Sequence, residues 1–287
     1  MANLSGTTRN WPGYLYVMPA FAWIALFFMA PLICMGAYSF FYVDYEGFLI
    51  KELSLVNYME LFSSKATTAA LINSVNLTLT VVVISLLMSY PLAMIILYKV
   101  PPKRQRLVLA LAILPFWTLY VVRSYAWLLT LSPTGVINQS LLAVGLIDKP
   151  LELAFNNGAT VVGYVHFFIM LNTLTIYANL AQINPRYLLA ARDLGASRLR
   201  AFCQVLLPLS LPGIAVGTFL TVVLCIGDFI TPQILGGNKD LLLPQAIMLQ
   251  IQTDANYPMA SAMSLVMTLV VCAAYLMLSR WMKMSKI

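Results

Sequence analysis

The sequence predicts an all-α membrane protein with several spanning helices, and three observations lead to that prediction. The chain has 287 residues, of which 61% are hydrophobic and 9% are charged. Its mean hydropathy is +0.85. Its apolar residues are gathered into six long runs. Soluble domains carry about 25% charged residues, so an ordinary soluble domain is excluded.

Each apolar run reaches the length of about 20 residues that a helix needs to cross the hydrocarbon core. Helices are expected because an open strand would leave backbone groups unpaired in lipid, and the alternation of a barrel strand is absent. The predicted spans are residues 14–41, 69–98, 107–131, 158–180, 206–227 and 259–279. With short loops between them, residues 1–287 are expected to form a single transmembrane domain.

Two apolar segments need a separate interpretation. The first run is longer than a signal-peptide core of about 7–15 residues, so we expect an uncleaved anchor. The segment at residues 241–251 is too short to cross, and we expect a re-entrant or interfacial helix there.

The distribution of charge predicts the orientation. If both termini are cytoplasmic, the cytoplasmic segments hold twelve of the 17 Lys and Arg residues, as basic residues prefer. These twelve are Arg9, Lys99, Lys103, Arg104, Arg106, Arg186, Arg192, Arg198, Arg200, Arg280, Lys283 and Lys286. External loops hold Lys51, Lys65, Lys149 and Lys239, together with nearly all the acids. Asp193 is then the one cytoplasmic acid.

Several functional classes lack their motifs. The four cysteines show no CxxC or Cys/His clustering, so neither a disulfide framework nor a metal site is indicated. The net charge of +7 is explained by topology, and no nucleic-acid partner is expected. No G-x-x-x-x-G-K-[ST] motif is present, so this chain is not expected to hydrolyse ATP.

The loop at residues 184–205 has the pattern of two short helices joined by an elbow. An Asn-Pro pair at 184–185 is typical of a helix start, because Pro in the first turn loses no hydrogen bond. The helix is expected to run to Leu194, Gly195 to end it in the left-handed conformation, and Ser197 to cap a second helix. Small residues at the elbow would let another protein approach closely. An amphipathic hairpin lying on lipid headgroups is the alternative, given the four arginines of the loop.

Residues 190–208, AARDLGASRLRAFCQVLLP, resemble the cytoplasmic signature of ABC-importer permeases, which is E-A-A, three residues, G, nine residues, I-x-L-P. The matching positions are Ala190, Ala191, Gly195, Leu207 and Pro208. Leu189 replaces the Glu of the signature and Val205 replaces the Ile. Loss of the Glu removes one polar contact from the expected interface, whereas the small residues of the elbow remain.

The resemblance implies that this loop is a coupling helix seated in a groove of a cytoplasmic ATPase. The residues expected at that contact are Leu189, Ala190, Ala191, Arg192, Asp193, Leu194, Gly195, Ala196 and Ser197. Closure of two ATPases would switch the permease from inward-open to outward-open. ATP and Mg²⁺ would be bound by the ATPase, and this chain would be a non-catalytic subunit without a cofactor of its own.

Four further stretches resemble the spermidine/putrescine branch of these permeases. They are LPFWTLYVVRSYAW (114–127), GVINQSLLAVGLIDKPL (135–151), GDFITPQILGG (227–237) and NYPMASAMS (256–264). The resemblance implies a bacterial inner-membrane subunit that forms half of a pathway for spermidine or putrescine. Its expected partners are an ABC ATPase dimer, a second permease that is either similar or identical, and an external solute-binding protein. Related branches carry opines, ferric iron or thiamine, so these solutes are alternatives.

Four residues near the outer ends of the spans are candidates for the translocation pathway. Arg123 lies within a predicted span, where a cation costs roughly 3 kcal/mol or more. It would order the pathway, pair with an acid at the outer boundary, or extend outward and anchor the helix. Asp228 ends the fifth span and would attract a cationic solute, pair with Arg123 or be solvated. Trp117 and Tyr120 fit an aromatic belt at the membrane interface, and they would also suit cation–π contact with a polyamine.

Other polar residues within the spans have simpler interpretations. The lone histidine, His166, is expected to be a hydrogen-bonded packing residue, since no second metal ligand or proton-relay partner is in sight. Asn172 is expected to hydrogen-bond across helices.

Two rival classes remain. An intramembrane enzyme would need paired acids, or Ser with His, within the spans. A stand-alone secondary transporter would need ion-coupling acids in the membrane and internal repeats. Neither pattern is visible in the sequence.

Overall fold

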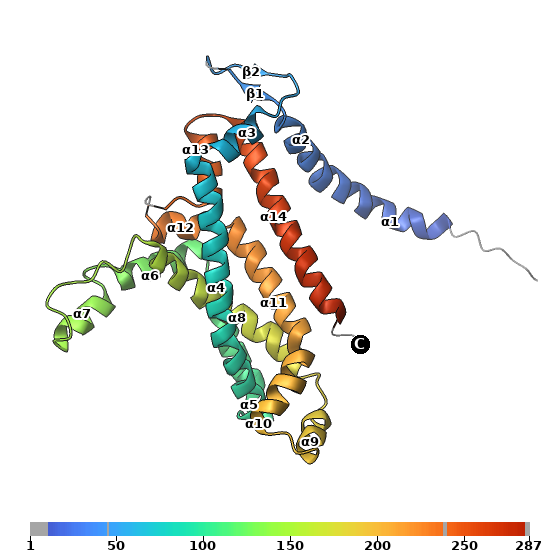
Figure 1. Ribbon diagram of the computed structural model, residues 1–287, viewed down its shortest axis with the longest axis vertical. Helices are drawn as coiled ribbons and strands as arrows, with labels where there is room; N and C mark the ends of the chain where they lie inside the picture. The colour runs from blue at the N-terminus through green and yellow to red at the C-terminus, as the bar shows by residue number, and fades with distance from the viewer. Residues whose placement is uncertain (1–10, 45, 238–239, 285–287) are drawn as a thin grey trace, which may run out of the picture.

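The computed structural model describes residues 11–44, 46–237 and 240–284, and it is almost wholly helical (Figure 1). The elements are α1 (Trp11–Ile24), η1 (Ala25–Met29), α2 (Ala30–Tyr38), β1 (Tyr42–Val43), β2 (Leu49–Ile50), α3 (Val56–Ser63), α4 (Lys65–Tyr98), α5 (Pro102–Ile113), η2 (Leu114–Trp117), α6 (Tyr120–Leu131), α7 (Val136–Ala143), α8 (Asn157–Leu180), α9 (Arg186–Asp193), α10 (Arg198–Ala201), η3 (Phe202–Leu206), α11 (Leu207–Gly227), α12 (Ile230–Leu235), α13 (Leu243–Gln252) and α14 (Tyr257–Met284). Arg9, Lys239 and Lys286, which were used in predicting the orientation, lie outside the described residues.

Five helices in the described residues are long and apolar enough to cross a membrane. They are Tyr16–Tyr38, Lys65–Tyr98, Asn157–Leu180, Arg198–Gly227 and Tyr257–Arg280. Five of the six predicted runs fall on these helices. The first helix ends at Tyr38, three residues before the predicted end at residue 41.

The run predicted as a span at residues 107–131 is not one helix. It is divided into α5, the 3₁₀ segment η2 and α6, with Leu119 extended at φ −58° and ψ 142°. A proline at position 115 accounts for the break, because proline has no backbone N–H with which to continue the helical hydrogen bonds. Figure 1 shows α6 leaving the end of α5 sideways, with α7 beyond it. The structure therefore does not show a single helix for the span predicted at residues 107–131, and the count of six spanning helices is not confirmed.

Two π-helical segments interrupt long helices at the same distance from a proline. Both η1 and η3 end two residues before a proline, Pro31 and Pro208. In each segment the closing bond runs from i+5 to i, as from the Leu207 N–H to the Phe202 carbonyl. The wider turn accommodates a proline ring that would otherwise clash with the carbonyl four residues earlier. Because η3 joins α10 to α11, the fifth long helix begins at Arg198, eight residues before the predicted start, and the loop predicted to end at residue 205 ends at residue 197.

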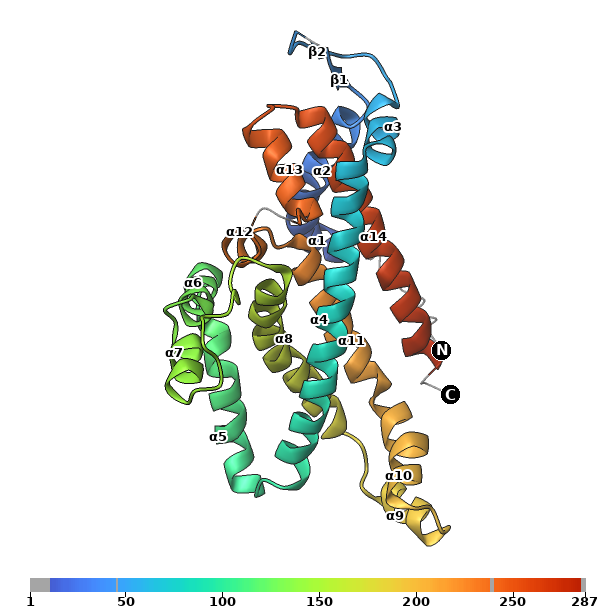
Figure 2. The ribbon, with the colours of Figure 1, turned by 60° about the vertical axis from the view of Figure 1, so that its left-hand side comes forward.

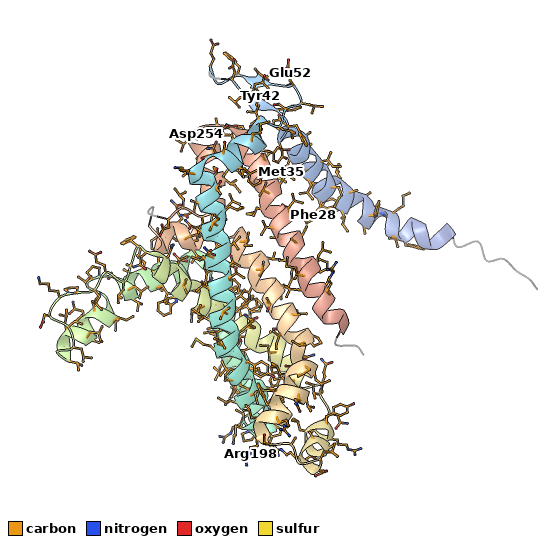
Figure 3. The ribbon with its side chains drawn as sticks, viewed as in Figure 1. Phe28, Met35, Tyr42, Glu52, Arg198 and Asp254 are labelled. Atoms are coloured by element: carbon orange, nitrogen blue, oxygen red, sulfur yellow. The ribbon has the colours of Figure 1, made fainter. Side chains whose placement is uncertain are left out.

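Helices α4, α8 and α11 form the central bundle (Figure 2). Leu77 and Val81 of α4 pack against Tyr164 and Phe168 of α8, with Cys225 of α11 closing the cluster. Helix α14 covers α11 on the other side and contacts α2. Beyond that contact, the N-terminal helix stands away from the bundle, and Phe28, labelled in Figure 3, is 65% exposed.

A polar side chain and two glycines hold the bundle helices together. Asn172 of α8 donates to Ser85 Oγ of α4 at 3.2 Å and to Thr221 Oγ1 of α11 at 3.0 Å. The prediction that Asn172 bonds across helices is therefore confirmed. Gly213 and Gly217, spaced as G-x-x-x-G, lie where α11 crosses α8 so closely that a Cβ on either would clash. Small residues at this spacing let transmembrane helices approach one another.

The two ends of the bundle carry different elements. At one end, the antiparallel hairpin pairs Tyr42 with Ile50, and α3 and α13 lie at the same end (Figure 1). Helix α13 is the helix predicted at residues 241–251; the Leu243 N–H donates to Ser74 Oγ of α4 at 2.7 Å. At the opposite end lie α9 and α10.

Candidate functional site

The elbow between α9 and α10 is closed by a complete Schellman motif. The Ala196 N–H donates to the Ala191 carbonyl at 3.0 Å, and the Gly195 N–H donates to the Arg192 carbonyl at 2.9 Å. Gly195 has φ +82°, a conformation that costs a residue with a Cβ roughly 1–2 kcal/mol. The predicted role of Gly195 as the helix stop is confirmed.

Side-chain caps complete both helix starts. The Asn184 Oδ1 accepts from the Arg186 N–H at 3.0 Å, and Ser197 Oγ accepts from the Arg200 N–H at 3.3 Å. The helix start near residue 184 and the Ser197 cap are therefore as predicted.

The base of the elbow is anchored to the bundle by apolar contacts. Leu188 and Phe202 pack against a buried cluster that includes Ile176, Leu180 and Leu206. With this base fixed, the Schellman motif determines where the tip of the elbow projects.

The outer surface of the elbow is apolar as well as basic. Leu189 is 55% exposed, Leu194 is 89% exposed and Leu199 is 73% exposed. Ala190, Arg192, Asp193, Gly195 and Ser197 are exposed too, whereas Ala191 and Ala196 are half-buried. A Cβ added at Gly195 would meet no atom within 4 Å, so the surface beside it is open. This combination of rigid backbone and exposed leucines is typical of a surface that contacts another protein or a membrane.

Arg123 is a buried cation held between aromatic rings. It is 6% exposed, and its guanidinium carbon lies 4.7 Å from the Tyr120 ring centroid and 4.3 Å from that of Phe167. Both terminal nitrogens are buried without a hydrogen-bond partner. This burial does not fit the alternative in which the Arg123 side chain extends outward to water.

Asp228 is engaged at the start of α12. Its Oδ1 accepts from the Ile230 N–H at 2.8 Å and from the Thr231 N–H at 3.3 Å, and its Oδ2 accepts from the Thr231 hydroxyl. No ion pair joins it to Arg123 in the described structure, where both terminal nitrogens of Arg123 lack a hydrogen-bond partner. A carboxylate in this position satisfies backbone donors that would otherwise be unpaired.

The remaining pathway candidates separate into two groups. Tyr120 is half-buried, with its ring 5.4 Å from that of Phe167. Trp117, in η2, is 85% exposed and has no part in this cluster. His166 packs edge-on against Trp127 at 5.5 Å, but its Nδ1 is buried without a hydrogen bond, so only the packing part of its prediction fits.

The structure therefore has two candidate regions that lie apart. The elbow is at one end of the molecule. Helix α6, which carries Arg123, and helix α12, which follows Asp228, lie near the middle (Figure 1). Sequence reasoning missed Phe167 and Thr231, which hold these two charged side chains. Phe167 had no signal, since it is one of 14 phenylalanines. Thr231, three residues after Asp228, has the spacing of a local cap.

Residues 107–285 match the family model of the binding-protein-dependent transport system inner membrane component. The spermidine/putrescine transport system permease protein PotB of Escherichia coli (strain K12) is 33% identical over 248 residues, which cover 86% of this chain and 90% of that protein. The inner membrane ABC transporter permease protein YdcU of the same strain is 29% identical over 295 residues, covering 96% of this chain and 92% of that protein.

A similar solved structure has the same fold. A chain of the bacterial alginate ABC transporter, crystallised in complex with an alginate pentasaccharide-bound periplasmic protein, superposes with a TM-score of 0.78. The superposition covers 94% of this chain and 93% of that chain at 19% sequence identity.

Proposed function

The chain belongs to the family of binding-protein-dependent transport system inner membrane components, and from this membership we propose that it forms half of an importer's pathway for a polyamine, spermidine or putrescine. The observation that carries the choice of solute is the 33% identity to a spermidine/putrescine permease over 86% of the chain. Opine, ferric iron and thiamine permeases of the same branch are the alternatives for the solute.

In this proposal the elbow at residues 189–197 is the contact with an ATPase. The Schellman motif and the anchored base support this role, because a rigid elbow can transmit a movement of the ATPase to the helical bundle. The exposed Leu189 and Leu194 supply apolar area for a partner. Leu189 in place of the signature's Glu makes this contact more apolar.

The complete importer would contain a dimer of ABC ATPases, a second permease and an external solute-binding protein. ATP and Mg²⁺ would be bound by the ATPases, and the end with α9 and α10 would face the cytoplasm together with both chain termini. The exposed basic residues at that end support this orientation. Membership of a binding-protein-dependent family supports the external partner.

Uptake of labelled putrescine and spermidine by cells lacking this chain tests the proposal. We expect deletion to abolish uptake and a plasmid copy to restore it. Unchanged polyamine uptake, together with lost uptake of ferric iron, thiamine or an opine, would identify one of the alternative solutes.

The energy source separates an ABC importer from a secondary transporter. We expect uptake to continue when a protonophore collapses the proton gradient while cellular ATP is maintained. Uptake that stops under this condition would contradict the ATP-driven mechanism.

A further inference from the structure

An apolar groove of about 350 Å³ lies between α4 and the helix formed by η3 and α11. Helix α4 contributes Leu87, Tyr90 and Pro91, and the other helix contributes Phe202, Leu207 and Ile214. The one polar atom among these side chains is turned away, since the Tyr90 hydroxyl is 2.9 Å from Ser210 Oγ. The Tyr90 ring meets Phe202 edge-on at 5.6 Å, so the groove presents almost only hydrocarbon.

The wall of the groove formed by η3 and α11 is about as long as one lipid leaflet is thick. At about 1.5 Å per residue, the helix from Phe202 to Ile214 rises about 18 Å. Half of the hydrocarbon core is about 15 Å. Leu87, on the rim, is 69% exposed, so the groove is open to whatever surrounds the chain.

Basic residues lie at the end of the groove that is nearest to α9 and α10. Arg198 precedes Phe202 by four residues on the same helix, and therefore lies on the same face one turn below it. Lys99 follows the last residue of α4. Both side chains are exposed, and neither pairs with an acid in the described structure. A hydrocarbon groove that ends in unpaired cations matches a lipid with an apolar chain and an anionic headgroup.

We propose that this groove binds an acyl chain of an anionic phospholipid in the leaflet on the α9 and α10 side, with the lipid phosphate at Arg198 and Lys99. Each basic residue near a membrane surface strengthens binding of anionic lipid by about fivefold. A transmembrane helix of a second permease is a poorer occupant, because its apolar side chains offer no countercharge to Arg198. The inference goes beyond the proposed transport function and needs no ATPase.

Native mass spectrometry of the full chain, with any chains that remain bound to it, tests the proposal. The protein is extracted and exchanged into mixed micelles containing phosphatidylglycerol and phosphatidylcholine. We expect one retained lipid with a preference for phosphatidylglycerol. Ile214→Trp fills the groove and should abolish this retention, while Arg198→Gln should lower the phosphatidylglycerol preference by about fivefold.

Matched controls separate the groove from general effects. Val216→Trp introduces the same side chain on α11 at an exposed position outside the groove lining, and Arg186→Gln removes a charge from α9. Both controls should retain the lipid as the unmodified chain does. Equal retention of the two lipids by the unmodified chain, or unchanged preference in Arg198→Gln, overturns the proposal. A photoreactive residue at Leu87 should label lipid; labelling of another polypeptide instead assigns the groove to a subunit interface and also overturns it.

Discussion

Gly195 combines two properties that are separable by mutation. Its φ of +82° favours a residue without a Cβ, and the space beside it is open. A side chain added there would therefore strain the backbone and would also project from the elbow toward any partner.

We expect Gly195→Trp to abolish uptake while the chain still inserts into the membrane. Gly145→Trp is the matched control, because Gly145 has φ +73° and also has no atom within 4 Å of an added Cβ, but lies in the loop after α7. Uptake is measured in membranes that contain equal amounts of each variant. Because backbone strain is present in both variants, loss of uptake in Gly195→Trp alone would show that the added side chain obstructs a partner. Normal transport by Gly195→Trp would refute the role of the elbow as the ATPase contact.

The buried guanidinium of Arg123 is expected to lower the stability of the chain. Cation–π contacts supply about 2 kcal/mol when desolvated, whereas an unpaired buried ion loses several kcal/mol of solvation. We therefore expect Arg123→Met to stabilise the purified chain by roughly 1–4 kcal/mol, and to impair uptake.

The measurement is the apparent unfolding temperature in detergent, which rises by about 2–4 °C per kcal/mol for chains of about 150–250 residues. Arg104→Met, at an exposed position in α5, should leave it unchanged. A lower unfolding temperature for Arg123→Met would mean that the guanidinium has a structural partner that stabilises the fold.

At the scale of elements, apolar run length predicted five long helices because hydropathy depends only on composition along the chain. The elbow was also predictable, since Gly195 and Ser197 act on neighbouring backbone. The break at Pro115 was overlooked because the run around it is uniformly apolar. The two π segments and the Phe167 contact with Arg123 depend on ring clashes and on packing between distant helices, which no local pattern encodes.

The G-x-x-x-G crossing at Gly213 and Gly217 gives a test of this packing. A Cβ at Gly217 would lie 2.6 Å from Thr175 Oγ1 and would clash with the Asn172 side chain that joins three helices. We expect Gly217→Ala to destabilise the chain by about 1–3 kcal/mol through overpacking. Gly227→Ala, on the same helix with no atom within 4 Å, should be neutral or slightly stabilising. Equal unfolding temperatures for the two variants would contradict the close approach of α8 and α11.

At the scale of the whole molecule, charge is separated along the long axis. Glu52 and Asp254 lie at the end with the hairpin, and Arg198 lies at the opposite end (Figure 3). Since basic residues are retained on the cytoplasmic side, this separation predicts that the end with Arg198 faces the cell interior. This prediction does not depend on which solute is transported.

Single-cysteine labelling measures that orientation directly. In a chain with Cys34, Cys203 and Cys272 changed to Ser, the remaining Cys225 is buried and gives a low background. We expect a membrane-impermeant maleimide to label Glu52→Cys in intact cells, because the proposed orientation places the hairpin outside. Ala190→Cys should be labelled only in inverted vesicles, because the elbow must face the compartment that contains ATP. Labelling of Ala190→Cys in intact cells would place the elbow outside, where no ATPase can reach it, and would exclude the coupling mechanism even if polyamine uptake depends on this chain.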